Sequence, residues 1–240
     1  MRQKTRKRRR VIRRIVKFVC ICICIVSALL VFTTKVLPSI IEMDNTSSGY
    51  GKCQIILDAG HGGEDIGTRG DGENYDVLEK DVNLAMVMQM QSLLEEYGVE
   101  VVLTRDSDET LSLKQRAKIE NDYEADLFVS IHCNYYEGDA SIRGFESYYY
   151  KRSDGGKQYA EQILKKIEDS GHVDARSAKG SNFYVLKHTK APAVLLELGY
   201  FSNTEECKLL SQEEYQEALA KELVVGIIDA LDNATDIQSH

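Results

Sequence analysis

The sequence predicts an α/β domain of three layers, with helices on both faces of a mixed, mostly parallel central sheet, preceded by one N-terminal transmembrane helix. Three observations lead to this prediction. Short apolar runs alternate with longer segments of helical periodicity from residue 54 onward. One run, LFVSIH at 127–132, is apolar at nearly every position, as in a strand buried on both faces. A basic head followed by a long uncharged run opens the chain.

The N-terminal segment has the pattern of an export signal. Ten of the first 17 residues are Lys or Arg, and the apolar run that follows carries no charge up to Thr34. A helix over residues 15–34 would be about 30 Å long, enough to cross a bilayer. We therefore expect a basic cytoplasmic tail at 1–17, an uncleaved signal anchor at 18–35 and a linker at 36–51. A nuclear-localisation or nucleic-acid patch beside a core helix fits this continuous run less well.

With such an anchor, the protein would cross the cell membrane once. The domain expected at 52–233 would lie outside the cytoplasm, and a C-terminal tail would follow at 234–240. Cleavage of the signal would instead release a secreted protein. Residues 1–35 hold 11 of the 30 basic residues and no acidic one, so the rest of the chain carries all 38 Asp and Glu. Such an acidic domain is a poor candidate for binding nucleic acid.

The first half of the domain alternates strand and helix. The apolar run QIIL predicts a strand at 54–57, which leads into the glycine-rich loop DAGHGG. Apolar residues at helical spacing predict a helix at 80–97, which Gly98 ends. The run VEVVL predicts a second strand at 99–103, and a second helix follows at 111–121.

The second half continues the alternation with weaker signals. The strongest strands are the apolar runs at 126–132 and 193–198. Tyrosine-rich alternation favours an edge strand at 144–150. We further predict a helix at 159–167, a short strand at 182–186 and a terminal helix at 213–231. The cysteines follow neither a disulfide framework nor a zinc ribbon, so we expect a monomer in which Cys53, Cys133 and Cys207 are free and mostly buried.

Residues able to bind a metal or a proton stand at three predicted strand ends. The first strand leads to His61, the third ends at His132, and the strand at 193–198 carries Glu197. Ligands bind beyond the carboxyl ends of strands in an open α/β sheet. Glu79 begins the first long helix, directly after the loop that holds His61. Two histidines, one carboxylate and a second carboxylate nearby fit a catalytic zinc site with an open position for water.

Each of these residues also has an ordinary explanation. A histidine at a strand end is more often packed or hydrogen-bonded than a ligand. Glu79 at a helix start favours the helix dipole. Glu197 is harder to explain in this way, because a carboxylate within the apolar run AVLLEL is costly to bury without a partner.

Four blocks of the sequence resemble the zinc-dependent N-acetylmuramoyl-L-alanine amidases, the cell-wall hydrolase family called amidase type 3. The blocks are LDAGHGG at 57–63, LEKDVNL at 78–84, SIHCN at 130–134 and LELGYFSN at 196–203. The resemblance covers the domain from about residue 54 to 231. It implies that His61, Glu79 and His132 bind Zn²⁺ and that Glu197 is the catalytic carboxylate.

The resemblance also implies a substrate and a mechanism. The substrate would be peptidoglycan, cleaved at the amide between the lactyl group of N-acetylmuramic acid and L-alanine of the stem peptide. Zinc would lower the pKa of a bound water to about 7, and Glu197 would carry its proton to the leaving nitrogen. One anchor with one catalytic domain resembles the germination-specific amidases of endospore formers, which suggests a role in sporulation.

Three further residues are expected near the substrate. Asn134 follows the second histidine block, and His188 precedes the strand that carries Glu197. Arg105 follows the second strand, where hydrogen bonds from it would orient the site. Tyr135 stands where the family usually has a small residue, so it could narrow the substrate groove.

Two other functions remain open. The segment HGGE at 61–64 also reads as the H-x-x-E ligand pair of zinc carboxypeptidases, in which Glu64 would replace Glu79 and stem peptides would be shortened. A catalytically silent wall-binding or regulatory module on the same fold is the second alternative. The segment at 135–144 is too short for a stable covering helix, which needs about 12–15 residues. We therefore expect an open site that needs no activator.

Overall fold

The computed structural model describes residues 54–71, 75–123 and 125–238, all within a compact unit that spans Tyr50–His240. The predicted cytoplasmic tail, signal anchor and linker lie outside the described residues, as does Cys53. Within the described part, no helix combines the length and the apolar character that a membrane span requires. Cys133 and Cys207 are free and buried, as expected.

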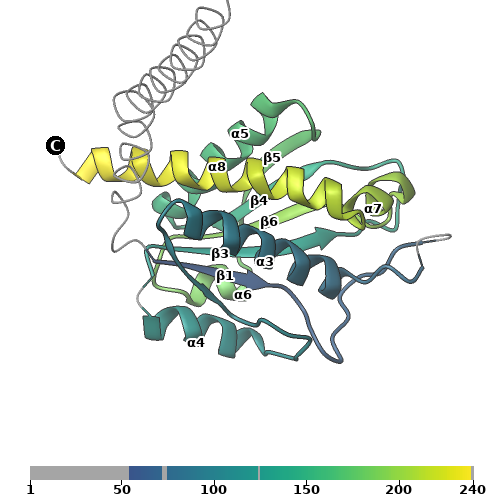
Figure 1. Ribbon diagram of the computed structural model, residues 1–240, viewed down its shortest axis with the longest axis horizontal. Helices are drawn as coiled ribbons and strands as arrows, with labels where there is room; N and C mark the ends of the chain where they lie inside the picture. The colour runs from purple at the N-terminus through teal and green to yellow at the C-terminus, as the bar shows by residue number, and fades with distance from the viewer. Residues whose placement is uncertain (1–53, 72–74, 124, 239–240) are drawn as a thin grey trace, which may run out of the picture. The chain divides into compact units, whose positions relative to one another are not determined.

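Six strands form one sheet at the centre of the domain (Figure 1). Their spatial order is β2 (Glu100–Leu103), β1 (Gln54–Ala59), β3 (Leu127–Asn134), β6 (Ala193–Tyr200), β4 (Phe145–Tyr150) and β5 (Ala175–Ser181). Neighbouring strands are parallel except for β4 and β6, which are antiparallel. The prediction of a mixed, mostly parallel sheet is confirmed.

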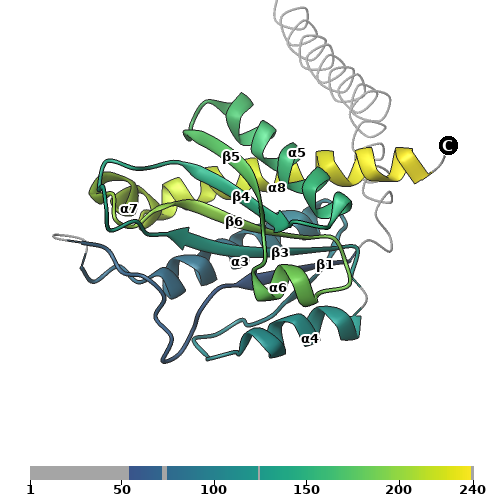
Figure 2. The same ribbon diagram turned by 180° about the vertical axis from the view of Figure 1, so that it is seen from behind.

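Helices cover both faces of this sheet. One face carries α3 (Glu79–Glu96), α5 (Asp154–Ser170) and α8 (Glu213–Gln238), and the view from behind shows α4 (Leu113–Tyr123) and α6 (Tyr184–His188) on the other (Figure 2). The larger core fills the first side, with Met86, Ile163 and Leu223 fully buried. A smaller core lies under α6 and includes Phe128 and Val185. Each core lies between the sheet and the helices on one of its faces, which gives the three layers predicted from the alternation of strands and helices in the sequence.

The structure corrects two predicted strands. Residues 182–186 are not a strand: Val185 and Leu186 belong to α6, whose first turn packs them into the smaller core. The strand lies just before, as β5, whose sequence ARSAKGS has almost no apolar alternation because it pairs only with β4 at the sheet edge. Accordingly β4 is not an edge strand, since it lies between β6 and β5.

Helix boundaries differ in smaller ways. Helix α5 starts at Asp154, earlier than predicted, because the hydroxyl of Ser153 accepts a hydrogen bond from the backbone N–H of Gly156 and caps the helix. Helix α8 continues to Gln238, and the short α7 (Thr204–Leu210) after β6 was not predicted. The fully described segment 135–144 holds turns and no helix, which confirms that no helix of its own covers the neighbouring site.

Candidate active site

The loop after β1 brings His61 to the carboxyl edge of the sheet. The backbone N–H of Gly60 donates to the carbonyl of Ile131, so the loop starts in contact with β3. A Cβ atom at Gly60 would lie 2.3 Å from the His132 ring, so only glycine lets the loop pass this close. His61 itself has φ 61° and is the one non-glycine residue with a positive φ in the described part of the chain. Such backbone strain is typical of functional sites.

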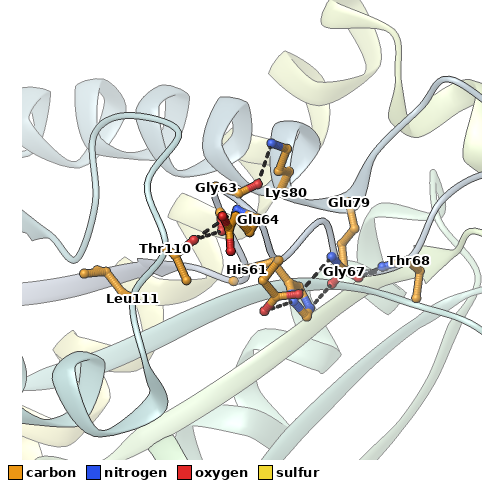
Figure 3. A network of polar contacts seen from close by, with 12 residues as sticks. His61, Gly63, Glu64, Gly67, Thr68, Glu79, Lys80, Thr110 and Leu111 are labelled. Carbon is orange, nitrogen blue, oxygen red and sulfur yellow. Dashed lines mark hydrogen bonds and ion pairs between the residues drawn. The ribbon is translucent and has the colours of Figure 1, made fainter.

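The same loop positions Glu79 by capping α3. Leu78 offers no side-chain cap, so the backbone N–H groups of Glu79 and Lys80 donate to the carbonyls of Thr68 and Ile66. Glu79 is the first residue of the helix and is only 2% exposed. Its Oε2 accepts hydrogen bonds from the backbone N–H of Thr68 at 2.7 Å and from the Thr68 hydroxyl at 3.1 Å (Figure 3). These bonds hold the carboxylate with Oε1 toward the histidines.

Three potential ligand atoms converge at this point. Oε1 of Glu79 lies 3.2 Å from Nε2 of His61 and 3.0 Å from Nδ1 of His132. The three atoms all lie within 4.8 Å of one another. Asp65 accepts a hydrogen bond from the other nitrogen of His61, Nδ1, at 2.9 Å. This contact turns Nε2 toward Glu79, in the way that a carboxylate orients a metal-binding histidine.

The donor set fits a metal ion. Two imidazoles and one carboxylate are the ligands of a catalytic zinc site that leaves a fourth position open. Burial acts to lower the pKa of His61, but hydrogen bonds and charge from Glu79 and Asp65 outweigh it and raise this pKa to about 9. Burial likewise acts to raise the pKa of Glu79, but the two histidines outweigh it and hold this pKa well below its usual range. The cluster is therefore built to hold positive charge, whether a proton or a metal ion.

Glu197 lies beside this set. The register of β3 and β6 pairs His132 directly with Glu197. Glu197 is half-buried, and its Oε2 is buried without a hydrogen-bond partner among the described residues. Burial raises the pKa of Glu197 to about 7, with the charge of His132 opposing the rise and the charges of Glu79 and Glu146 adding to it. A carboxyl group with such a pKa can both accept and donate a proton near neutral pH.

A buried ion pair supports the loop from below. Asp58, the fifth residue of β1, accepts hydrogen bonds at 2.7 Å from Arg116, Thr104 and Ser130. Arg116 on α4 also donates to the backbone carbonyls of Ala59 and His61 at 2.6 Å. The backbone of the metal-binding loop is thus tied to a charge pair that is almost inaccessible to solvent.

Arg105 has a similar supporting role. It is 2% exposed, and its guanidinium donates to the carbonyls of Ala59, Gly60 and Lys80 at 2.8–3.0 Å. These bonds join the end of β1 to the first turn of α3, which carries Glu79. The hydrogen-bonding role predicted for Arg105 agrees with this placement, although Arg105 itself is buried.

The other predicted site residues lie further out. Glu64 is exposed beside Thr110, which accepts a hydrogen bond from its backbone N–H, and Glu64 is outside the converging set (Figure 3). Oδ1 of Asn134 accepts from the backbone N–H of Tyr135 and shapes the turn after β3. The ring of His188 is exposed and stacks on Tyr184, with centroids 4.1 Å apart.

A cleft of about 400 Å³ opens over the site on the α4 and α6 face. His61, His132 and Glu197 contribute its polar floor, and its apolar walls include Leu111, Phe183 and Leu195. His188 and Tyr135 are not among its lining residues; the Tyr135 hydroxyl instead donates to Asp71 at 2.8 Å. The cleft gives a solvent-borne substrate access to the converging ligand atoms.

Sequence reasoning missed Asp65, Thr68 and Arg116. Asp65 stands four residues after His61, a spacing that a search for acidic neighbours of a metal-binding histidine could have found. Arg116 gave no signal, because a buried arginine in the polar helix LKQRAKIENDY reads as a solvated residue.

The carboxyl edge of this α/β sheet thus carries a His–Glu–His set that could hold a metal ion, with a carboxyl group beside it that has no hydrogen-bond partner among the described residues. Residues 55–229 match the family described as N-acetylmuramoyl-L-alanine amidase. The chain belongs to this family, whose members cleave the amide bond between N-acetylmuramic acid and L-alanine in peptidoglycan.

Individual relatives are similar over most of the same domain. The uncharacterized protein YqiI of Bacillus subtilis is 38% identical over 175 residues, which cover 72% of this chain and 82% of YqiI. The probable cell wall amidase LytH of Staphylococcus aureus is 34% identical over 72% of this chain, and the match spans only 56% of LytH.

Solved structures agree as well. The amidase AmiC2 of Nostoc punctiforme is 36% identical, with a TM-score of 0.71, over 77% of this chain and 99% of that one. The CwlD amidase of Clostridioides difficile, solved in complex with the GerS lipoprotein, is 33% identical, with a TM-score of 0.70, over 75% of this chain and 99% of CwlD.

Proposed function

We propose that this chain is a zinc-dependent N-acetylmuramoyl-L-alanine amidase, with His61, Glu79 and His132 as zinc ligands and Glu197 as general base. The convergence of the three ligand atoms within 4.8 Å of one another carries the proposal. Family membership supports the substrate and the bond. The unpaired Oε2 of Glu197, beside His132, supports the role of the base.

In this proposal, different residues of the chain hold the zinc and transfer the proton during hydrolysis. Bound zinc would supply a Lewis acid and a water of lowered pKa, near 7. Glu197 accepts a proton as water attacks the carbonyl carbon, and it delivers this proton to the nitrogen as the C–N bond breaks. The products are the muramoyl carboxylic acid and a stem peptide with a free L-alanine amine. Losing such a proton carrier costs about 10²–10⁴-fold in rate.

The two alternatives are weaker. A carboxypeptidase that uses Glu64 as a ligand would need this exposed side chain to displace Glu79 from the histidines. A catalytically silent module would not need the three proposed zinc ligands and the proposed general base, all four of which are present in the sequence. Digestion of purified cell wall distinguishes the three functions. Free L-alanine N-termini would support the amidase, and stem peptides shortened at their C-termini would support the carboxypeptidase. An unchanged wall would support the silent module.

We further propose that residues 18–35 anchor the enzyme in the cell membrane, with the catalytic domain outside the cytoplasm, where peptidoglycan lies. Protease protection of the tagged termini in spheroplasts tests this. A role in spore cortex stays a prediction, because the identity to CwlD does not exceed that to AmiC2. Loss of muramic δ-lactam from spores of a deletion strain would support it.

Elemental analysis of purified residues 50–240 tests the chemistry. We expect one zinc per chain, loss of turnover with a chelator, and recovery when zinc is returned. Glu197→Gln should keep its zinc and its fold but lose at least about 100-fold in turnover. Wild-type turnover in that variant, or full activity of verified metal-free protein, would refute the proposal.

A further inference from the structure

A charged cluster continues from the active site across the sheet. The register of β4 and β6 places Glu146 directly opposite Glu197, so the two side chains share a face of the sheet. Glu146 is fully buried, and its Oε1 accepts hydrogen bonds from Nε of Arg176 at 2.9 Å and Nζ of Lys179 at 2.6 Å. Its Oε2 accepts from the hydroxyl of Tyr148 at 2.7 Å. Both basic residues belong to β5.

The two basic side chains around Glu146 carry more positive charge than is required to neutralise its carboxylate. One cation would neutralise Glu146, yet two contact the same oxygen. Burial acts to raise the pKa of Glu146, but Lys179, Tyr148 and Arg176 outweigh it, so the group stays ionised. The side chains of Arg176 and Lys179 are 40% and 44% exposed. Glu146 therefore holds two cationic groups in place while leaving them open to solvent.

The distance from the reacting bond limits what these cations can bind. Neighbouring strands lie about 4.8 Å apart, so β5 is about 10 Å from Glu197 on β6, two strands away. An extended peptide covers about 3.3 Å per residue, and three residues span this distance. Val185 and Leu186 of α6 pack toward Tyr148 of β4, and Phe183 just before α6 lies against the Tyr148 ring, with centroids 5.3 Å apart. Strand β5 lies beyond β4 at the edge of the sheet. A peptide that leaves the site in this direction would meet Arg176 and Lys179.

We propose that Arg176 and Lys179 form a subsite for a carboxylate of the stem peptide, about three residues beyond the cleaved amide, and that Glu146 positions them. The inference rests on the proposed function, because the stem is part of that substrate. The lactyl carboxyl of the muramic acid is consumed in the amide bond, so the anionic groups that this reaction presents lie in the stem. Arginine and lysine together suit such a carboxylate through charge-assisted hydrogen bonds.

The test compares two muropeptides that differ only in whether the third stem residue and the stem terminus carry free carboxylates or carboxamides. Wild-type enzyme should show a KM about 10-fold lower for the free acid. Arg176→Gln and Lys179→Gln should each raise this KM several-fold toward that of the amide, with little change in kcat. Arg176→Lys keeps the charge and should retain most of the preference. Lys165→Gln, in an exposed pair with Asp169 on α5, is the matched control and should change neither KM.

The outcomes separate this inference from the proposed function. If wild type cleaves both muropeptides with equal KM, or if Arg176→Gln and Lys179→Gln weaken both equally, the subsite is refuted while the amidase remains. If wild-type enzyme holding zinc cleaves neither, the proposed function fails and the subsite with it. Circular dichroism of each variant confirms that a change in KM is not a loss of fold.

Discussion

The buried pair beneath the metal-binding loop allows a sharp test of how the site is supported. We predict that Asp58→Asn leaves the fold intact but destabilises it substantially. The substitution keeps the shape of the side chain and removes its charge. Arg116 is then left as a cation only 3% exposed, with no counter-ion of its own. The amide NH₂ also replaces one of the acceptor oxygens that bind the hydroxyls of Thr104 and Ser130.

The expected magnitude follows from these contacts. Removing one partner of a buried ion pair costs about 3–5 kcal/mol. We expect the lower end, about 3 kcal/mol, because Arg116 keeps its hydrogen bonds to the carbonyls of Ala59, His61 and Leu111. In a domain of this size, about 1 kcal/mol corresponds to about 2–4 °C, so Tm should fall by about 6–12 °C.

Urea denaturation and thermal melting of residues 50–240 provide the assay. Lys118→Gln is the matched control, because it removes an exposed pair with Asp122 on the same helix and should cost at most about 0.5 kcal/mol. A change in Asp58→Asn no larger than that of the control would refute the view that this pair supports the loop.

Four further predictions concern the metal site, pH and control of access. Glu79→Ala should lose zinc, whereas Glu64→Ala should keep it; the opposite result, by elemental analysis, would make Glu64 the ligand. Asp65→Ala should weaken zinc affinity about 10- to 100-fold by competition with a chelator, because His61 loses its orienting carboxylate; unchanged affinity would deny Asp65 that role. Burial acts to raise the pKa of Asp58, but Arg116 and hydrogen bonds outweigh it and lower this pKa below its unfolded value of about 3.9. Its contribution to stability should therefore be full above about pH 5 and be lost as the pH falls through the folded-state pKa, and an equally steep acid transition in Asp58→Asn would contradict this. Finally, residues 50–240 should cleave muropeptides without an activator; folded, zinc-loaded protein that works only with a second protein would refute the open-site reading.

Much of the fold followed from periodicity in the sequence. The runs that became β1, β3 and β6 are apolar because helices cover both faces of these central strands. The same rule could not find β5, since an edge strand with charged residues on it, such as Arg176 and Lys179, carries no such run. Propensity also misassigned residues 182–186, where the apolar residues pack from a helix rather than from a strand.

The candidate site was predictable only in part. His61, Glu79 and His132 stand in motif blocks, and the structure brings them together. The groups that hold them come from distant segments: Arg116 reaches the loop from α4, and Thr68 reaches Glu79 from a loop without regular structure. Such contacts depend on tertiary packing, which local sequence patterns do not encode. Conversely His188, which precedes the strand that carries Glu197, is not among the residues that line the cleft; its ring stacks on Tyr184, which is.

Amide cleavage by Glu197 and the His61–Glu79–His132 site is tested most directly by mass spectrometry of muropeptides after digestion with zinc-loaded residues 50–240, with Glu197→Gln in parallel. The wild type should form stem peptides with free L-alanine N-termini and glycan strands with intact, unsubstituted muramic acid, and these products should be almost absent with Glu197→Gln. Stems shortened at their C-termini, or the same products in equal yield from the Glu197→Gln variant, would contradict this mechanism.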